Sequence, residues 1–287
     1  MGSPVNQPGK SPAEPRRRRA FVSSAVKRTA AVASRVRTPS AGVVVLIYHR
    51  VGGGSGLELD LSVRQFAEQM AWLAERGGAT TLDGALAALE DVDRPRVDPV
   101  VVTFDDGTED FVDKAVPVLA RYGIPATLYL STAFVESGHP LPYGAPPVSW
   151  DGLRDALSTG RITIGSHTHT HSLLDRLPPE ELARELDEPS RLIERELQVT
   201  PRHFAYPKAL APSPAAETAV RARFLSAALA GTRPNPYGAT DVFRLARSPI
   251  QASDGMRWFR AKAEGGMALE DDFRRALNRV RYRGDAS

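Results

Sequence analysis

The chain has 287 residues, of which 42% are hydrophobic and 25% charged, enough to bury one large core. It contains no cysteine, which excludes disulfide frameworks, thiolate metal sites and cysteine nucleophiles, so any bound metal must be held by His, Asp or Glu. The net charge of +3 is unevenly placed: residues 1–40 hold nine basic residues and one acidic residue, and the remainder holds 28 basic and 33 acidic residues. An acidic remainder repels the nucleic-acid backbone, so we expect no nucleic-acid partner.

Residues 1–40 are rich in Pro, Ser, Ala and Arg and have too few apolar residues to pack, which predicts a basic, disordered tail. Residues 18–22 resemble a twin-arginine export signal only weakly, because four later cations interrupt the apolar stretch. Apolar residues between Val22 and Val36 share one helical face, which predicts at most a weak contact with an anionic membrane surface. With no convincing signal peptide and no apolar run of about 20 residues, we expect a cytoplasmic or peripheral membrane location rather than secretion.

From residue 42 onward, short β-branched runs alternate with helical patterns, which is typical of βα units around a parallel sheet. We expect one catalytic domain over residues 41–287. In chain order, the predicted elements are strand 43–48, a helix capped by Ser62 with Phe66, Met70 and Leu73 buried, strand 100–104, helix 109–122, strand 124–130, loop 137–148, a helix capped by Ser149, strand 162–164, helix 178–197, strands 203–206, 225–229 and 247–250, and helix 272–282. The Gly and Pro content of residues 137–148 predicts a long loop that walls a cleft.

Reactive side chains follow four of the predicted strands. They are Tyr48-His49, Asp105-Asp106, His167 to His171 and Tyr206-Pro207. Because the carboxyl ends of parallel strands meet at one edge of a sheet, we expect these groups to gather there.

Each group alone also has a structural interpretation. Adjacent aspartates can cap a helix and open a turn, and a run of histidines can be a surface turn. Together they predict more, because imidazoles at i and i+4 share one side of a helical turn and a carboxylate completes a three-ligand metal site with open positions. Two aspartates are useful there: one binds the metal, and its neighbour removes a proton from metal-bound water.

The motifs Thr103-Phe104-Asp105-Asp106-Gly107 and Ser166-His167-Thr168-His169-Thr170-His171 resemble the first two motifs of the polysaccharide deacetylase family, carbohydrate esterase family four, also called the NodB-homology family. Tyr48-His49-Arg50-Val51 and Phe204-Ala205-Tyr206-Pro207 are similar to further landmarks of its exopolysaccharide-deacetylase branch. The similarity covers roughly residues 43–250. It implies an α/β fold, a distorted and incompletely closed (β/α) barrel.

The resemblance also implies an activity. By it, Asp106, His167 and His171 would bind a divalent metal, usually zinc, with cobalt, nickel or iron as alternatives. Asp105 would be the general base, and hydroxide would attack the acetamide carbonyl of an N-acetylated carbohydrate, yielding acetate and a free amine. The metal and a backbone N–H after Pro207 would stabilise the oxyanion. We also expect Tyr206, Pro207 and Lys208 to line the substrate site, with the Lys208 side chain contacting an anionic substrate group.

The sequence departs from the family pattern in the third motif and near its end. Pro207-Lys208-Ala209 replaces Pro-Tyr-Gly, and Ala205 stands where other branches carry an arginine that supports the catalytic aspartate. No histidine follows His203, so the late Leu-His motif that supplies the general acid is absent. We hypothesise that His49 donates the proton, the alternative being that it only hydrogen-bonds its own loop. His169 should point away from the face shared by His167 and His171.

Three other functions remain open from the sequence. The altered third motif allows a carbohydrate-binding pseudoenzyme that keeps the metal site as structure. The lack of an export signal allows a deacetylase of a small biosynthetic intermediate. A membrane- or nucleic-acid-binding protein driven by the tail is the third. The sequence predicts no oligomeric state.

Overall fold

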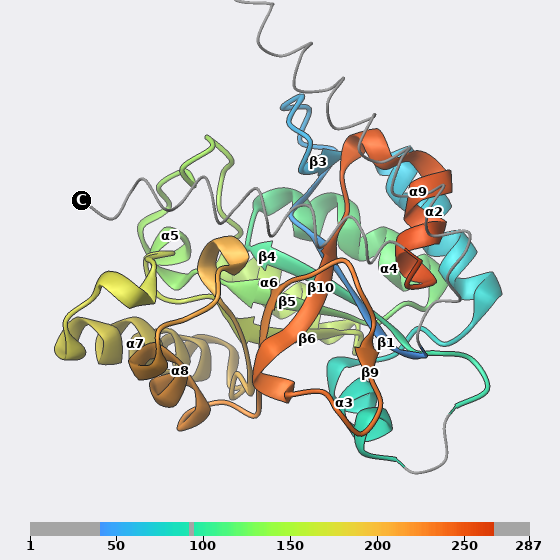
Figure 1. The fold of residues 1–287 in the computed structure, drawn as a ribbon. Coiled ribbons are helices and arrows are strands. Elements are labelled where there is room, and N and C mark those ends of the chain that lie inside the picture. The colour runs from blue at the N-terminus through green and yellow to red at the C-terminus, as the bar shows by residue number, and fades with distance from the viewer. Residues whose placement is uncertain (1–40, 92–94, 267–287) are drawn as a thin grey trace, which may run out of the picture. The chain divides into compact units, whose positions relative to one another are not determined.

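The computed structural model describes residues 41–91 and 95–266. The tail predicted over residues 1–40 and the helix predicted over residues 272–282 lie outside these ranges. Within them, strands alternate with helices around a central sheet (Figure 1). The predicted α/β class is confirmed.

The central sheet is a closed ring of parallel strands. Its members in spatial order are β1 (Gly42–Tyr48), β4 (Val100–Asp106), β5 (Ala126–Leu130), β6 (Ile162–Ser166), β7 (His203–Ala205), β8 (Ser226–Ala230) and β10 (Leu245–Pro249). Strand β10 also pairs with β1, with Arg247 opposite Val45. The predicted barrel is confirmed, and this last pairing closes the ring more fully than the incomplete barrel that we expected.

Three short strands lie outside the ring. They are β9 (Asn235–Pro236), which runs antiparallel to the start of β1, and β2 (Arg50–Val51) and β3 (Asp60–Leu61), which pair with each other. The β2–β3 pair follows directly after His49 and orders the chain next to the end of β1.

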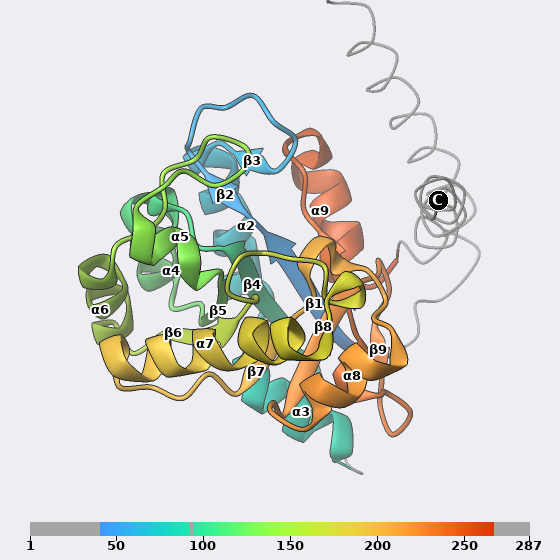
Figure 2. The same ribbon diagram turned by 90° about the vertical axis from the view of Figure 1, so that its left-hand side faces the viewer.

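Most helices cover the outside of the barrel, and one, α3, packs on the cluster that fills its interior. They are α2 (Val63–Arg76), α3 (Leu82–Glu90), α4 (Val116–Tyr122), α5 (Thr132–Ser137), α6 (Trp150–Ser158), α7 (Pro179–Leu197), α8 (Pro214–Arg221) and α9 (Gly255–Ala263), with a π-helical turn η1 (Phe111–Ala115) and 3-10 turns η2 (Leu174–Arg176), η3 (Pro207–Ala209), η4 (Val242–Arg244) and η5 (Ala252–Asp254). In Figure 1, α2 and α9 pack on one flank of the barrel and α7 and α8 on another. Figure 2 shows α7 crossing in front of β6 and β7.

The strands are continuous apolar runs because both of their faces are covered. Along β1, Leu46 points outward into the cluster that holds Phe66 of α2, and Val45 points into the barrel with Val101 of β4. Side chains alternate between these two clusters with the period of two that a strand imposes. The continuous runs therefore mark the barrel wall.

Serine side chains begin two of the predicted helices. The Ser62 hydroxyl accepts the N–H of Gln65 at 3.2 Å, and the Ser149 hydroxyl accepts the N–H of Gly152 at 3.1 Å. Both predicted caps are confirmed. The helix predicted over residues 109–122 is confirmed, but residues 111–115 within it form the π-helical turn η1, just before Pro117, which has no N–H to continue a regular ladder.

Helices α3, α5, α8 and α9 were not predicted from the sequence. Each has only six to nine residues, and such helices are stable only when tertiary packing buries one face. None of the described helices is both long enough and apolar enough to cross a membrane.

Candidate functional site

The candidate residues gather at the carboxyl end of the barrel. His49 directly follows β1, Asp106 is the last residue of β4, and His167 directly follows β6. Pro207 lies two residues beyond β7. The four groups predicted after separate strands therefore share one end of the ring, where loops are free to carry function.

Three of these side chains converge on one point. The Nε2 atoms of His167 and His171 each lie 3.5 Å from Oδ1 of Asp106, and one ligand atom from each residue falls within 4.8 Å of the others. Oδ1 is buried and has no hydrogen-bond partner. Metal–ligand bonds near 2.1 Å in a tetrahedron predict ligand atoms about 3.4 Å apart. These three residues could therefore hold a metal ion.

The His167 ring is oriented by a backbone carbonyl. Its Nδ1 lies 2.7 Å from the carbonyl oxygen of Ala205. Since a carbonyl can only accept, Nδ1 carries the hydrogen and donates it, which leaves the Nε2 lone pair of the neutral ring facing Asp106. This hydrogen bond to a backbone carbonyl fixes the ring orientation in which Nε2 could bind a cation.

The segment from His167 to His171 is irregular, so the predicted helical turn is wrong. Thr168 and His171 adopt φ values of 67° and 61°. These two left-handed residues, and not an i, i+4 helical spacing, bring both imidazoles to the same side. Non-glycine residues rarely adopt this region, because the side chain crowds the backbone.

Unusual backbone conformations concentrate at this end of the barrel. Among the described residues, six non-glycine residues have positive φ, and one of them, Gln198, ends helix α7. The other five lie in the three candidate loops: Asp106, Thr168, His171, Lys208 and Ala209. Such conformations cost about 1–3 kcal/mol each and persist where surrounding contacts enforce them, often at functional sites.

The second aspartate is held inside the barrel by an arginine that the sequence analysis did not identify. Arg247 of β10 is fully buried, and its Nη1 and Nη2 donate to Oδ1 and Oδ2 of Asp105 at 2.6 and 2.9 Å. Nη1 also lies 3.2 Å from the Thr103 hydroxyl. The bidentate pair fixes the orientation of the Asp105 carboxylate, next in sequence to Asp106.

Small residues inside the barrel leave room for the large side chains of Arg247 and Tyr129. Arg247 lies over the Tyr129 ring at 5.0 Å, and a Cβ at Gly165 would come within 2.6 Å of that ring. Ala205 and Ala228 line the same interior. Position 205, where the resemblance to the family leads to the expectation of a supporting arginine, is small here, and Arg247 reaches Asp105 from β10.

Burial and charge act against each other on the two carboxylates. Burial is the largest influence on Asp105 and raises its pKa, but Arg247 and nearby histidines outweigh it, so the pKa lies below its usual value. Burial also raises the pKa of Asp106, and His167 and His49 reverse this and hold it well below its usual range. Both carboxylates are therefore ionised at neutral pH.

The two histidines shift in opposite directions. Burial lowers the pKa of His167, but the adjacent charges of Asp105 and Asp106 raise it above its usual value. Burial and the charge of His167 lower the pKa of His171. A cation would therefore compete with a proton at His167.

The loop predicted over residues 137–148 reaches the cluster. Its only described polar contact with Asp106 is the Tyr143 phenol, which donates to Oδ2 at 2.8 Å. Backbone bonds tie the loop to the aspartate turn, because Val148 N–H donates to the carbonyl of Gly107. Gly107 has φ of 90°, and a Cβ there would meet Leu130 at 2.4 Å, so glycine is required. The sequence analysis did not identify Tyr143.

The remaining predicted residues lie as follows. His49 is half-buried, and its side chain has no hydrogen bond to any residue within 41–91 and 95–266, yet its charge influences Asp105, Asp106 and His171. His169 turns away to the Thr132 hydroxyl, 2.9 Å from Nδ1, as predicted. The Tyr206 ring packs on Phe204 in the core, with centroids 5.1 Å apart, so only its backbone adjoins the site.

Pro207 is buried and Lys208 is exposed in the turn η3. Lys208 and Ala209 both have left-handed φ values, which redirect the backbone after Pro207. The side chain of Lys208 is therefore open to solvent.

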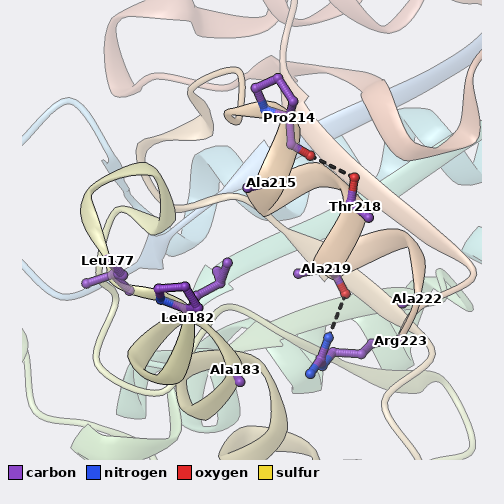
Figure 3. Close-up of a pocket in the computed structure, with 10 residues that line it drawn as sticks. Leu177, Leu182, Ala183, Pro214, Ala215, Thr218, Ala219, Ala222 and Arg223 are labelled. Atoms are coloured by element: carbon purple, nitrogen blue, oxygen red, sulfur yellow. Dashed lines mark hydrogen bonds between the residues drawn. The ribbon is translucent and has the colours of Figure 1, made fainter.

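A separate apolar groove of about 630 Å³ lies between α7 and α8 (Figure 3). Its walls include Leu182, Pro214, Thr218 and Ala219. None of the residues described above at the barrel end lines it. The groove therefore belongs to helix packing and not to the Asp106 cluster.

Comparison with known proteins relates this arrangement to one family. Residues 93–224 match the family model for polysaccharide deacetylase. YxkH of Bacillus subtilis (strain 168) is 28% identical over 164 residues, 57% of this chain and 55% of that protein. The poly-beta-1,6-N-acetyl-D-glucosamine N-deacetylase of Escherichia coli (strain K12) is 26% identical over 141 residues, 45% of this chain and 21% of that protein. The match thus spans about half or less of these curated relatives.

Solved structures share the barrel. IcaB from Ammonifex degensii superposes with a TM-score of 0.67 at 25% identity, covering 79% of this chain and 98% of that chain. The Streptococcus pyogenes deacetylase PplD in complex with acetate gives 0.68 at 19% identity, covering 78% and 99%. Residues 93–224, which hold the motifs at the ends of β4 and β6, thus match the polysaccharide deacetylase family, and the solved structures share the fold of the described residues.

Proposed function

We propose that this protein is a metal-dependent N-deacetylase that hydrolyses acetamide groups on an amino-sugar polymer or glycoconjugate. The observation that carries the proposal is the convergence of Asp106, His167 and His171, with Asp105 held beside them and free of the cluster. The similarity to a poly-beta-1,6-N-acetyl-D-glucosamine N-deacetylase supports the substrate class.

The three residues fit a divalent cation. Two imidazole nitrogens and one carboxylate oxygen form a donor set that suits zinc, and Oδ1 of Asp106 is buried with no other partner. The 3.5 Å separations of both Nε2 atoms from Oδ1 agree with tetrahedral coordination. When bound, a cation would lower the pKa of a water ligand and polarise the acetamide carbonyl.

Asp105 is the proposed general base. Arg247 occupies one lone-pair direction on each carboxylate oxygen, and each oxygen retains another that can accept a proton from the attacking water. The ion pair keeps the carboxylate ionised and fixes its direction. Asp105 would thus act from a preset position.

The loop after β7 and the loop after β1 supply the other proposed groups. The backbone N–H of Lys208, directly after Pro207, would donate to the developing oxyanion, and its exposed side chain would contact an anionic substrate group. His49 would protonate the leaving nitrogen as the C–N bond breaks, so that acetate and a free amine leave.

The direct test is acetate release by the full chain. After chelator treatment we expect no release from N-acetylglucosamine oligomers, and recovery on adding zinc or cobalt. Asp105→Asn, which keeps the side-chain shape, should lower the metal-restored rate by at least about 100-fold. A metal-loaded wild-type chain that binds oligomers and releases no acetate would instead establish a carbohydrate-binding protein.

Two further measurements refine the proposal. Comparing the oligomer with monomeric N-acetylglucosamine separates polymer from small-molecule specificity. His49→Ala should slow turnover by about 100-fold or more if it is the acid. Full turnover by this variant would exclude the catalytic role of His49.

A further inference from the structure

Helix α7 contains a proline in its interior. Pro189 has no N–H, so it cannot pair with the carbonyl of Glu185 four residues earlier, as a regular helix requires. A buried carbonyl without a donor is costly. Here the donor comes from outside the helix, since His169 N–H donates to the Glu185 carbonyl at 3.1 Å.

The Glu185 side chain contacts the same segment. It is only 4% exposed, its Oε2 accepts the N–H of Thr170 at 2.8 Å, and its Oε1 accepts the Thr170 hydroxyl at 2.7 Å. One helical residue thus accepts three hydrogen bonds from His169 and Thr170. We call these three bonds the Glu185 clamp.

The segment is also held from its other side. The N–H of Ala133 donates to the His169 carbonyl at 2.9 Å, and the Ser131 hydroxyl donates to the His167 carbonyl at 3.0 Å. The Glu185 clamp is the contact nearest in sequence to His171, whose φ of 61° needs external support. Releasing the clamp would free His171 more than His167.

We propose that Glu185 is a positioning residue for the His167–His171 segment and that Pro189 makes its carbonyl available for this role. The inference rests on the proposed metal-dependent function, because the clamp matters only if the imidazoles hold a cation. Contacts that orient metal ligands typically change metal affinity by about 10–100-fold when removed.

The first test compares two glutamates of α7. Glu185→Ala removes the side-chain part of the clamp, and Glu188→Ala is the matched control, because Glu188 bonds Arg191 on the same helix. Cobalt affinity, followed by the visible absorbance of the bound ion, should fall by about 10–100-fold in Glu185→Ala and stay unchanged in Glu188→Ala. At saturating cobalt, acetate release by Glu185→Ala should approach the wild-type rate.

The second variant, Pro189→Ala, distinguishes loss of the Glu185 clamp from a folding defect. Alanine returns an N–H that competes with His169 for the Glu185 carbonyl, so cobalt affinity should fall by about fivefold. Alanine is also a better helix former than proline, so Tm should not fall. If Pro189 had a merely structural role, Pro189→Ala would lower Tm and leave cobalt affinity unchanged.

A metal-free readout separates the two proposals. Amide hydrogen exchange at Thr170 should be about tenfold faster in Glu185→Ala than in the wild-type chain. Equal exchange, or equal cobalt affinity in both chains, would overturn the clamp. If the wild-type chain binds no cobalt, the proposed function fails, and the exchange rates still decide whether Glu185 holds the segment.

Discussion

Arg244, the last residue of η4, and Arg247, in the middle of β10, are three residues apart, and both pair with carboxylates. Arg244 lies on the surface, 46% exposed, where it and Arg221 share Glu217. Arg247 is 0% exposed inside the barrel and pairs with Asp105. Two Arg–carboxylate pairs therefore occur in different environments, although the two arginines are only three residues apart.

The two ion pairs differ in how much hydration free energy is lost when they form. Surface pairs keep most of their hydration and contribute about 0–1 kcal/mol to stability. A buried pair loses hydration on both ions, and apolar residues of similar size are often at least as stable. Stability alone therefore does not explain why an arginine is buried at position 247. Its contact with the proposed general base gives a functional explanation.

Breaking the buried pair should have the largest effect. Arg247→Met leaves the Asp105 charge buried without a partner, which should lower the free energy of unfolding by about 3–5 kcal/mol. Acetate release should fall by at least about 100-fold, because the base loses its orientation. Urea unfolding and the acetate assay measure the two effects.

A double variant separates stability from function. Asp105→Asn with Arg247→Met removes both charges, so more than half of the lost unfolding free energy should return while acetate release stays absent. If the double variant is no more stable than Arg247→Met alone, the unpaired Asp105 charge is not the source of the loss.

Tyr143→Phe should have an intermediate effect, confined to metal affinity. It deletes the single oxygen that donates to Oδ2 of Asp106, so cobalt affinity should fall by about tenfold. The ring remains half-buried, so the free energy of unfolding should change by less than about 1 kcal/mol. Unchanged cobalt affinity would show that Asp106 needs no support from the loop.

The surface pair should give the smallest effect, visible in its pH dependence. Hydrogen bonding to Arg244 lowers the pKa of Glu217 to about 2 from 4.5. Because the folded pKa lies below the unfolded one, this stabilisation is present above pH 4.5 and is lost as pH falls towards 2. With solvent screening, Glu217→Gln should cost about 1 kcal/mol at pH 6 in urea unfolding, and less at pH 3. A cost that does not shrink at pH 3 would contradict this assignment.

The barrel wall was predictable because its signal is local. Residues such as Val45 and Val101 lie in continuous apolar runs, and a strand covered on both faces needs such runs. The caps at Ser62 and Ser149 were predictable for the same reason, since each involves residues three apart. The short helices α8 and α9 were not, because only packing against the barrel selects their buried face.

The candidate site divides in the same way. Asp105, Asp106, His167 and His171 stand out in the sequence because reactive groups follow apolar strands. Arg247, Tyr143 and Glu185 carry weaker signals: a cation within a strand, an aromatic in a Gly and Pro loop, and a proline four residues after a glutamate. Each contacts a residue of the two sequence motifs at least 15 positions away in the chain.

The sequence by itself determined the barrel strands, the motif residues and the end of the sheet at which they gather, since these depend on the period of side chains along a strand. Only the tertiary structure decided which side chains support them. Closing the ring places β10 beside β1, and left-handed φ values at Thr168 and His171 replace the expected helical turn. Both depend on contacts between distant segments, whose free energy exists only after the chain has folded.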